Sequence, residues 1–298
     1  MNFLNGLNTI VVATDLHGQA EAALEYARKL AKAYGSRIIL AHGLDPLDYA
    51  AVDAIPEQVL KDLNENACGV LEKLSADLLQ EGIHSHSEIR QGAVAEMLVD
   101  VAKQYQAGLI MIGTEGKEGA GPVVVGAIAE RLVRLAPCPV LAVAADWNAG
   151  PNRPTPGGPV LLAIERNVAA PEAAACACSL AEKFARPLIL VHVRTAEEAR
   201  PTLNPDVIRV QDYGICPKRG VLIQEIVKDG NPADAITETI QQHHPCILVV
   251  GVKRTSDSPG PHGTAFALLA RSRVPVLCVP PAWSPGIWEK EGTLALEA

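Results

Sequence analysis

The residues with the clearest chemical potential lie between Leu109 and Ala127, where an apolar run ends in a glycine-rich segment. Its three glycines are Gly113, Gly116 and Gly126. Glycines let a backbone approach a bulky anion, and the first amides of a following helix are unpaired donors at the positive end of its dipole. The pattern therefore predicts a strand, a phosphate-binding loop and a helix that resumes near Ile128. Glycine is also common in ordinary strand-to-helix connections, so this structural reading stays open.

Short apolar runs alternate with amphipathic segments throughout the first half of the chain. We expect strands at residues 9–14, 38–41, 84–90, 109–112 and 140–144, with helices between them. The third strand is the most polar and is expected near a sheet margin. Such alternation predicts a parallel sheet with right-handed crossovers and helices on its faces.

Polar residues and glycines follow several of the expected strands. Thr14 and Asp15 end the first strand, and His42 and Gly43 end the second. In an open parallel sheet, ligands bind beyond the carboxyl ends of the strands, where the strand order reverses. A carboxylate, a backbone rim and a phosphate loop are what an adenine nucleotide site needs. Asp15 also suits a helix cap or turn, and we predict that His42 is a packed, hydrogen-bonded structural residue.

The same pattern starts again after residue 158. An apolar run ends in Glu165 as the first one ends in Asp15, and His192 lies 150 residues after His42. The later matches have offsets of 138 and 136 residues, so the second copy lacks about a dozen residues between its second and third strands. These ordered matches predict two homologous domains. The expected bounds are a first domain at 1–146, a linker at 147–158, a second domain at 159–282 and a tail at 283–298.

Taken together, these motifs resemble those of the universal stress protein family, over both halves of the chain. The family signature is Gly-x2-Gly-x9-Gly followed by Ser or Thr, and the chain has its three glycines at this spacing with Ala127 in place of the hydroxyl residue. Asp15, the Leu40 and His42 pair, and the Pro-Val-Leu-x-Val run from Pro139 also match. The resemblance implies two tandem α/β/α domains, each a five-stranded parallel sheet of the Rossmann-like, adenine nucleotide alpha hydrolase type.

The resemblance also implies which residues would bind ATP, AMP or ADP, with Mg²⁺ as a possible companion ion. They are Ala13, Thr14 and Asp15 at the adenine or ribose, Gly43 at the adenine rim, and Ile112, Gly113, Gly116, Gly126, Ala127 and Ile128 around the phosphates. The lost hydroxyl at Ala127 costs on the order of 1.5–3 kcal/mol, which weakens binding without abolishing it. In the second copy Arg254 replaces a signature glycine, so we expect a degenerate, structural domain.

Composition and charge narrow the classes of partner. The net charge is −8 and no basic stripe is present, which argues against nucleic acid or an anionic membrane as partner. The apolar runs are too short to span a membrane, and no cationic segment precedes the first one, so we expect a cytoplasmic protein. The seven cysteines are scattered through apolar runs and are predicted to be buried, reduced thiols.

The leading interpretation is a cytoplasmic stress-response protein that binds ATP or a related nucleotide in its first half. It is not expected to be an enzyme, although slow hydrolysis stays open. The alternatives are a nucleotide-independent scaffold for an unidentified regulatory protein and, less favoured, an enzyme of adenylate chemistry. By resemblance, residues 140–144 and 276–279 should pair in an intramolecular pseudodimer, with Trp147 and Trp283 packed at that junction. A homodimer also stays open.

Overall fold

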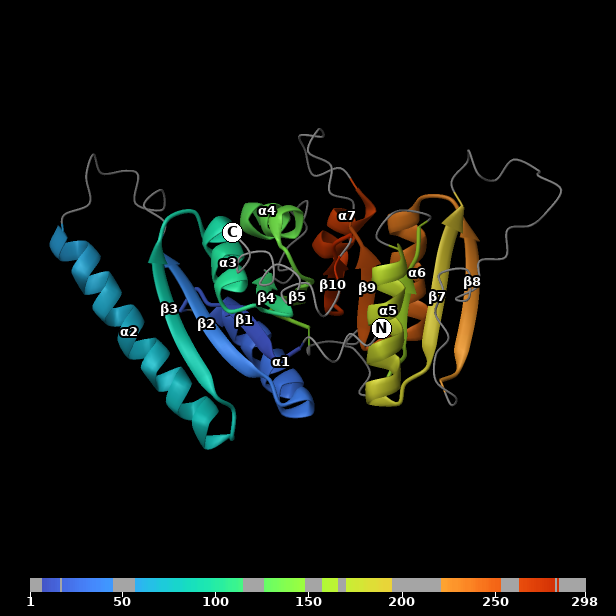
Figure 1. The fold of residues 1–298 in the computed structure, drawn as a ribbon. Helices are drawn as coiled ribbons and strands as arrows, with labels where there is room; N and C mark the ends of the chain where they lie inside the picture. Colours follow the sequence, from blue (N-terminus) through green and yellow to red (C-terminus); the bar gives the residue numbers. More distant parts are fainter. Residues whose placement is uncertain are drawn as a thin grey trace, which may run out of the picture. The chain divides into compact units, whose positions relative to one another are not determined.

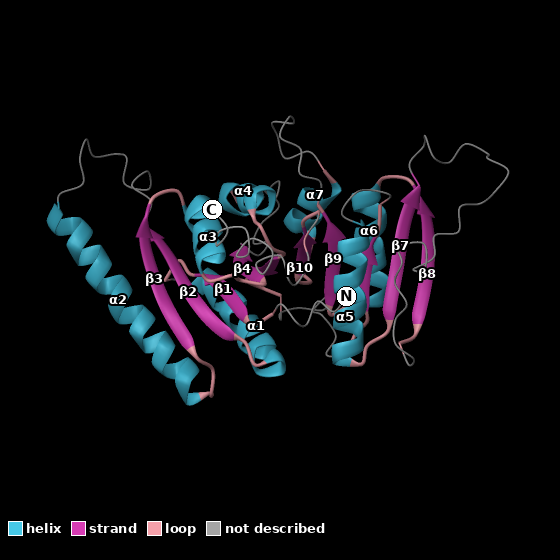
Figure 2. Ribbon diagram, viewed as in Figure 1, coloured by secondary structure: helices cyan, strands magenta, loops and turns pink. Residues whose placement is uncertain are grey.

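The computed structural model describes residues 7–16, 18–44, 57–114, 126–147, 157–165, 170–194, 221–252, 263–281 and 283. These residues divide into two compact units, the first comprising those up to 145 and the second those from 146 onward. Strands alternate with helices along each unit (Figures 1 and 2).

The first unit is built on a five-stranded parallel sheet. Its elements are β1 (Thr9–Ala13), α1 (Gly18–Tyr34), β2 (Arg37–Leu44), α2 (Glu57–Gln80), β3 (Ser85–Gln91), α3 (Val94–Gln104), β4 (Leu109–Thr114), α4 (Ala127–Leu135) and β5 (Val140–Ala144). The strands pair in the order β3-β2-β1-β4-β5, and each of these pairs is parallel. The predicted fold class is confirmed, and the polar strand β3 forms a margin of this sheet, as predicted.

The strand order reverses at β1. The chain moves from β1 to β2 and β3 in one direction and then returns to β4 on the other side of β1. Because crossovers between parallel strands are right-handed, α1 and α2 cover one face and α3 and α4 cover the other. In agreement, α3 packs against α4 and α2 packs along β3 (Figure 1).

Burial explains why β1 lies in the middle of this sheet. Ile10, Val11 and Val12 are each fully buried, so both faces of the strand are covered. A continuous apolar run without alternation is typical of such a strand. Aliphatic side chains such as Leu98 of α3 and Leu132 of α4 supply the neighbouring core, in keeping with the low aromatic content of the chain.

The second unit repeats this topology. Its elements are β6 (Val160–Ala163), α5 (Ala170–Phe184), β7 (Leu188–Arg194), β8 (Ile223–Asp229), α6 (Pro232–His243), β9 (Ile247–Gly251), α7 (Thr264–Arg271) and β10 (Val276–Val279). The strand order is β10-β9-β6-β7-β8, again with parallel pairs. The predicted repeat is therefore confirmed, because both units have the same strand order. The connection between β7 and β8 is the shortened one and lies mostly outside the described residues.

Backbone details fix which residues correspond between the two units. The amide of Ile38 donates to the carbonyl of His84 at 2.9 Å, and the amide of Leu188 donates to that of Leu222 at 2.8 Å. Left-handed residues also recur after equivalent helices: Gly35 and Ala185, and Gln106 and His244. These matches allow the units to be compared residue by residue.

The six described cysteines form no disulfide among themselves, which agrees with the predicted reduced state, and four of them are buried as predicted. Cys138, Cys176, Cys178 and Cys278 are buried, whereas Cys68 and Cys246 are half-buried and Cys216 lies outside the described residues. Burial raises the pKa of the Cys178 and Cys278 thiols to about 12, so both are protonated at neutral pH. Within the ranges given above, no helix has the length and apolar character that crossing a bilayer requires.

Candidate functional site

The carboxyl ends of β1 and β4 lie side by side where the strand order reverses. Val12 of β1 pairs with Met111 of β4, so the residues that follow them share one edge of the sheet. These residues are Ala13, Thr14 and Asp15 from the first strand and Ile112 and Gly113 from the second. The edge of an open α/β sheet at such a reversal is the usual place for a ligand.

The turn after β1 is held by several specific hydrogen bonds. The amide of Thr14 donates to the carbonyl of Ala41 at 2.9 Å and extends the ladder with β2. The hydroxyl of Thr14 accepts the amide of Leu16 at 3.1 Å. Leu16 has a φ of 62°, a conformation that costs a non-glycine residue about 1–3 kcal/mol and persists only where its surroundings hold it. Asp15, which is partly exposed, therefore occupies a defined position ahead of α1.

His42 has a structural role, as predicted. Its Nδ1 lies 2.7 Å from the carbonyl oxygen of Thr14, and the residue is only 9% exposed. Because a carbonyl can only accept, Nδ1 carries the proton in this contact. The second unit repeats the arrangement, with Nδ1 of His192 3.1 Å from the carbonyl oxygen of Ile164. Both histidines tie the end of one strand to the turn after its neighbour.

Gly43 is required by packing. A Cβ atom on this residue would lie 2.9 Å from Cγ2 of Val94 and 3.1 Å from Cε of Met97, both on α3. The close approach of α3 to β2 therefore accounts for the glycine without a ligand. The assignment of Gly43 to an adenine rim stays a prediction.

Gly126, at the start of α4, differs from Gly43 because close packing does not explain it. Gly126 is the N-cap, with φ −54° and ψ 136°, and no side chain caps the helix there. A Cβ atom on Gly126 would meet no described residue within 4 Å, and a φ of −54° suits other residues, so neither its conformation nor its described neighbours demand a glycine. Ala127 is exposed, and 47% of Ile128 is exposed despite its apolar side chain. Within the described ranges, nothing separates the first turn of α4 from a group that approaches from solvent.

One predicted difference between the copies falls outside the described residues. It is the replacement of the signature glycine, Gly116 in the first loop, by Arg254 in the second. Two other positions of the second unit are described. Glu165, the counterpart of Asp15, is exposed after β6, and Gly263, the counterpart of Gly126, is the N-cap of α7. Gly263 has an extended backbone, and a Cβ there would make an ordinary contact of 3.8 Å with Phe266.

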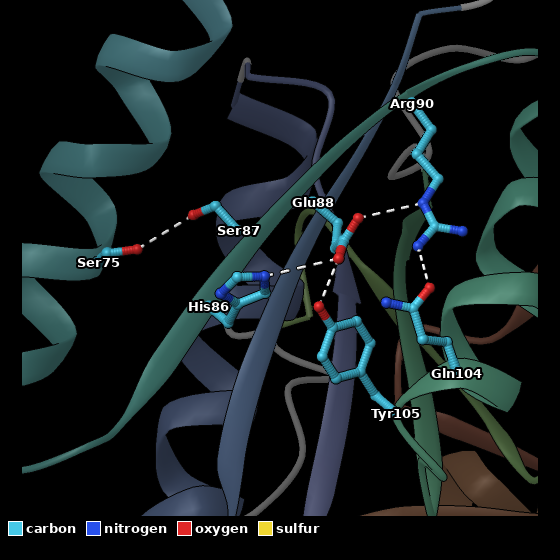
Figure 3. A network of polar contacts seen from close by, with 7 residues as sticks. All are labelled: Ser75, His86, Ser87, Glu88, Arg90, Gln104 and Tyr105. Carbon is cyan, nitrogen blue, oxygen red and sulfur yellow. Dashed lines mark hydrogen bonds and ion pairs between the residues drawn. The ribbon is translucent and has the colours of Figure 1, made fainter.

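A polar network on β3 was missed by the sequence analysis (Figure 3). The carboxylate of Glu88 accepts the hydroxyl of Tyr105 and, at 3.1 Å, Nε of Arg90, while Nε2 of His86 lies 3.5 Å away. Burial alone would raise the pKa of Glu88, but the hydrogen bonds from Tyr105 and Arg90 outweigh it and lower that pKa. The one available signal was the placement of His86, Glu88 and Arg90 on one face of a strand at period two.

The described residues contain no group of three His, Cys, Asp or Glu side chains that could hold a metal ion. His84 and His86 are both exposed.

Comparisons with known proteins agree with the fold. Residues 6–144 match the sequence model of the universal stress protein family. A universal stress protein of Thermus aquaticus is 31% identical over 137 residues, covering 45% of this chain and 97% of the relative. Another, from Mycolicibacterium smegmatis, is 30% identical over 202 residues, covering 66% of this chain and 67% of the relative. The crystal structure of a universal stress protein from Archaeoglobus fulgidus shares the fold, with a TM-score of 0.74 and 17% identity over 92% of this chain and 98% of that chain.

The packing around Gly43 makes a prediction about stability. Gly43→Ala should lower the free energy of unfolding by about 1–3 kcal/mol, because the new methyl group overpacks the contact with α3. Gly69→Ala is a matched control, since Gly69 is an exposed residue of α2 with open space around it, and it should raise stability by about 0.5–1 kcal/mol. Urea denaturation followed by circular dichroism measures both. Equal effects of the two substitutions would contradict the packing argument.

The lowered pKa of Glu88 makes a prediction about pH. A carboxyl group with a lower pKa in the folded state stabilises the fold above its unfolded value of about 4.3 and loses that contribution as the pH falls through the folded value. Glu88→Gln should therefore flatten the loss of stability below about pH 4.3. Glu65→Gln, on the exposed side of α2, should leave the slope unchanged. Denaturation curves between neutral pH and strongly acidic pH test this, and identical slopes for Glu88→Gln and the parent would refute it.

Proposed function

The chain belongs to the universal stress protein family, and from this premise we propose that its first unit binds an adenine nucleotide, either ATP or its relatives AMP and ADP. The proposed site is the edge of the sheet at the carboxyl ends of β1 and β4. The observation that supports it is the reversal of strand order at β1, beside which Asp15 and Gly113 lie. The proposed activity is binding in a stress response, and no catalytic residue is assigned.

Each predicted residue has a chemical role in this proposal. The carboxylate of Asp15 is an acceptor for the hydroxyl groups of a ribose, and the turn made by Ala13 and Thr14 sets its position. Ile112 and Gly113 continue the edge from β4, and Gly43 borders it from β2. The held turn after β1 supports this assignment, because it orders the acceptor before a ligand arrives.

The phosphates are assigned to the glycine loop and the start of α4. The free amides of the first turn and the positive end of the helix dipole both favour an anion. No described side chain caps the helix at Gly126, which leaves these amides available in the proposal. The nearest carboxylates of α3 and α4 are neutralised, because Glu96 pairs with Arg131 and Glu130 pairs with Arg134 at 2.8 Å. Gly116 completes the loop in the proposal, and Mg²⁺ would accompany a triphosphate.

The second unit is proposed to be structural. Its backbone repeats the first unit, but Glu165 replaces the aspartate and Arg254 replaces a glycine of the signature. We also retain, as predictions from the family resemblance, the pairing of residues 140–144 with 276–279, the domain bounds at 146 and 159, a cytoplasmic location and an unidentified regulatory partner.

Titration calorimetry with ATP tests the proposal, and two N-cap glycines provide a matched pair. Gly126→Val should weaken ATP binding by about tenfold or more, because the side chain covers the amides of α4. Gly263→Val makes the same change at the N-cap of α7 and should leave the affinity unchanged. Neither substitution meets a close contact with a described residue, so both variants should fold. Absence of heat with the parent protein at millimolar ATP would favour the nucleotide-independent scaffold, and equal losses for both variants would refute the asymmetry between the units.

A substitution at position 127 should strengthen ATP binding, in contrast to Gly126→Val, which should weaken it. Ala127→Ser supplies the hydroxyl that the family signature has at this place. A hydrogen bond to a charged phosphate contributes about 1.5–3 kcal/mol, so the affinity for ATP should rise by about tenfold or more. Ala127 is exposed, so Ala127→Ser should not disturb the core. An unchanged affinity for ATP would place the phosphates away from this turn.

A further inference from the structure

A pocket lies within the first unit, at the opposite edge of the sheet from Asp15. It has a volume of about 630 Å³ and is lined by residues at the amino ends of β1 and β2, at the start of β3 and at the carboxyl ends of α1, α2 and α3. Its polar and charged lining includes Thr9, Lys32, Arg37, His84 and Tyr105. This volume lies within the usual range of about 300–1,000 Å³ for small-molecule sites.

The guanidinium group of Arg37 is held by two hydrogen bonds, and part of it is still able to bind a ligand. Its Nε donates to Oγ1 of Thr9 at 2.9 Å, and its Nη2 donates to the carbonyl oxygen of Tyr105 at 3.4 Å. The guanidinium carbon lies 5.7 Å from the centre of the Tyr105 ring. No carboxylate in the described part of the chain pairs with Arg37, and Nη1 is left without a contact there. A fixed guanidinium with free donors is suited to an oxygen anion.

Tyr105 is itself held by the network on β3. Its hydroxyl donates to Glu88, which also accepts Nε of Arg90, and its ring centre lies 5.5 Å from that of His86 (Figure 3). The wall of the pocket that supports Arg37 is therefore ordered by contacts outside the pocket. This is the preorganisation that a binding site for a small ligand requires.

The charges around the pocket favour an anion. Two carboxylates contact residues of the pocket lining. Glu81 is shared by Lys32 at 2.6 Å and Arg28 at 3.2 Å, and Glu88, which accepts the hydroxyl of Tyr105, also accepts Nε of Arg90 at 3.1 Å. Among the described residues that line the pocket there is no Asp or Glu. Both carboxylates are thus paired with cations, whereas Arg37 has no carboxylate partner among the described residues.

The carboxyl ends of α1, α2 and α3 also line the pocket, but they do not make it favour a cation. Exposed carbonyls there carry partial negative charge and would attract a cation. The carbonyl of Ala31 accepts the amides of Gly35 and Ser36, that of Leu78 accepts two amides, and that of Ala102 accepts one. These acceptors are already used, so they offer little to a cationic ligand.

The second unit shows that the fold does not need these side chains. The residues equivalent to Arg37, Lys32, His84 and Tyr105 are Pro187, Glu182, Leu222 and His243. The backbone at these positions is the same in both units, because the hydrogen bonds of Ile38 and Leu188 correspond. Arg37 and Lys32 are therefore not required by the fold, and the arginine at this edge of the second unit, Arg186, lies beside Gly157 instead.

We propose that this pocket binds a small organic anion that carries a carboxylate or phosphate group. Arg37 anchors the anionic group, Lys32 provides a second cation, and the polar lining from Thr9 and Tyr105 surrounds the remainder. The site is separate from the proposed nucleotide site and does not depend on it.

Titration of the full chain with citrate and with inorganic phosphate, followed by amide shifts in NMR spectra, tests this proposal. At least one probe should produce saturable shifts at residues 8–9, 35–37 and 105–106. Arg37→Gln and Lys32→Gln should each weaken that binding by about tenfold. Lys183→Gln, at the last turn of α5, makes the same charge change in the second unit and should leave the affinity unchanged. Gly126→Val should also leave it unchanged, which separates this site from the nucleotide site.

The outcomes against the proposal are distinct. Absence of saturable shifts at these amides with either probe up to about 10 mM overturns it. It is also overturned if ethanolamine, a cationic probe, binds there in place of the anions, or if Lys183→Gln weakens binding as much as Arg37→Gln. Thermal unfolding of each variant verifies that it is folded, and Lys32→Gln remains informative if Arg37→Gln is unstable, because Lys32 is half-exposed. Stronger binding of citrate than of phosphate would assign the pocket to carboxylates, and the reverse order would assign it to phosphates.

Discussion

The parallel pairing of β4 with β1 is the constraint on which the first unit depends. With β2 already on one side of β1, this pairing forces the chain to reverse its direction across the sheet. Right-handed crossovers then put α1 and α2 on one face and α3 and α4 on the other, which buries both faces of β1. The same pairing brings Asp15 and Gly113, which are far apart in sequence, to one edge. Architecture and candidate site thus follow from one contact.

Much of the fold could be predicted from the sequence, because buried positions are occupied by apolar residues and exposed positions by polar ones. The continuous apolar run of β1 indicated a strand covered on both faces, and the polar run of β3 indicated a margin of the sheet. The recurrence of His42 as His192 indicated a structural role, which their matching carbonyl contacts confirm. Offsets between repeated motifs predicted two copies of one topology, and the strand orders agree.

The remainder depends on distances that residue types do not encode. A glycine needed by a neighbouring helix and a glycine needed by a ligand look alike in a sequence, and only the contacts with Val94 and Met97 separate Gly43 from Gly126. The Glu88 network joins two elements through Tyr105, and neither element alone predicts it. The pocket beside Arg37 arises from the register between β1 and β2, which pairs Thr9 with Arg37 and lets their side chains meet.

The polarity of the α/β unit explains why its two proposed sites differ in chemistry. Every helix in such a unit runs antiparallel to the strands, so helix amino ends gather at the carboxyl edge of the sheet and helix carboxyl ends at the amino edge. An anion at the carboxyl edge can be held by backbone amides, and glycine is then the residue that matters, as at Gly126. An anion at the amino edge meets carbonyls, so charged side chains must supply the attraction. Arg37 and Lys32 supply it in the first unit, whereas Pro187 and Glu182 occupy the same backbone in the second, so anion binding at that edge can be gained or lost without any change of fold.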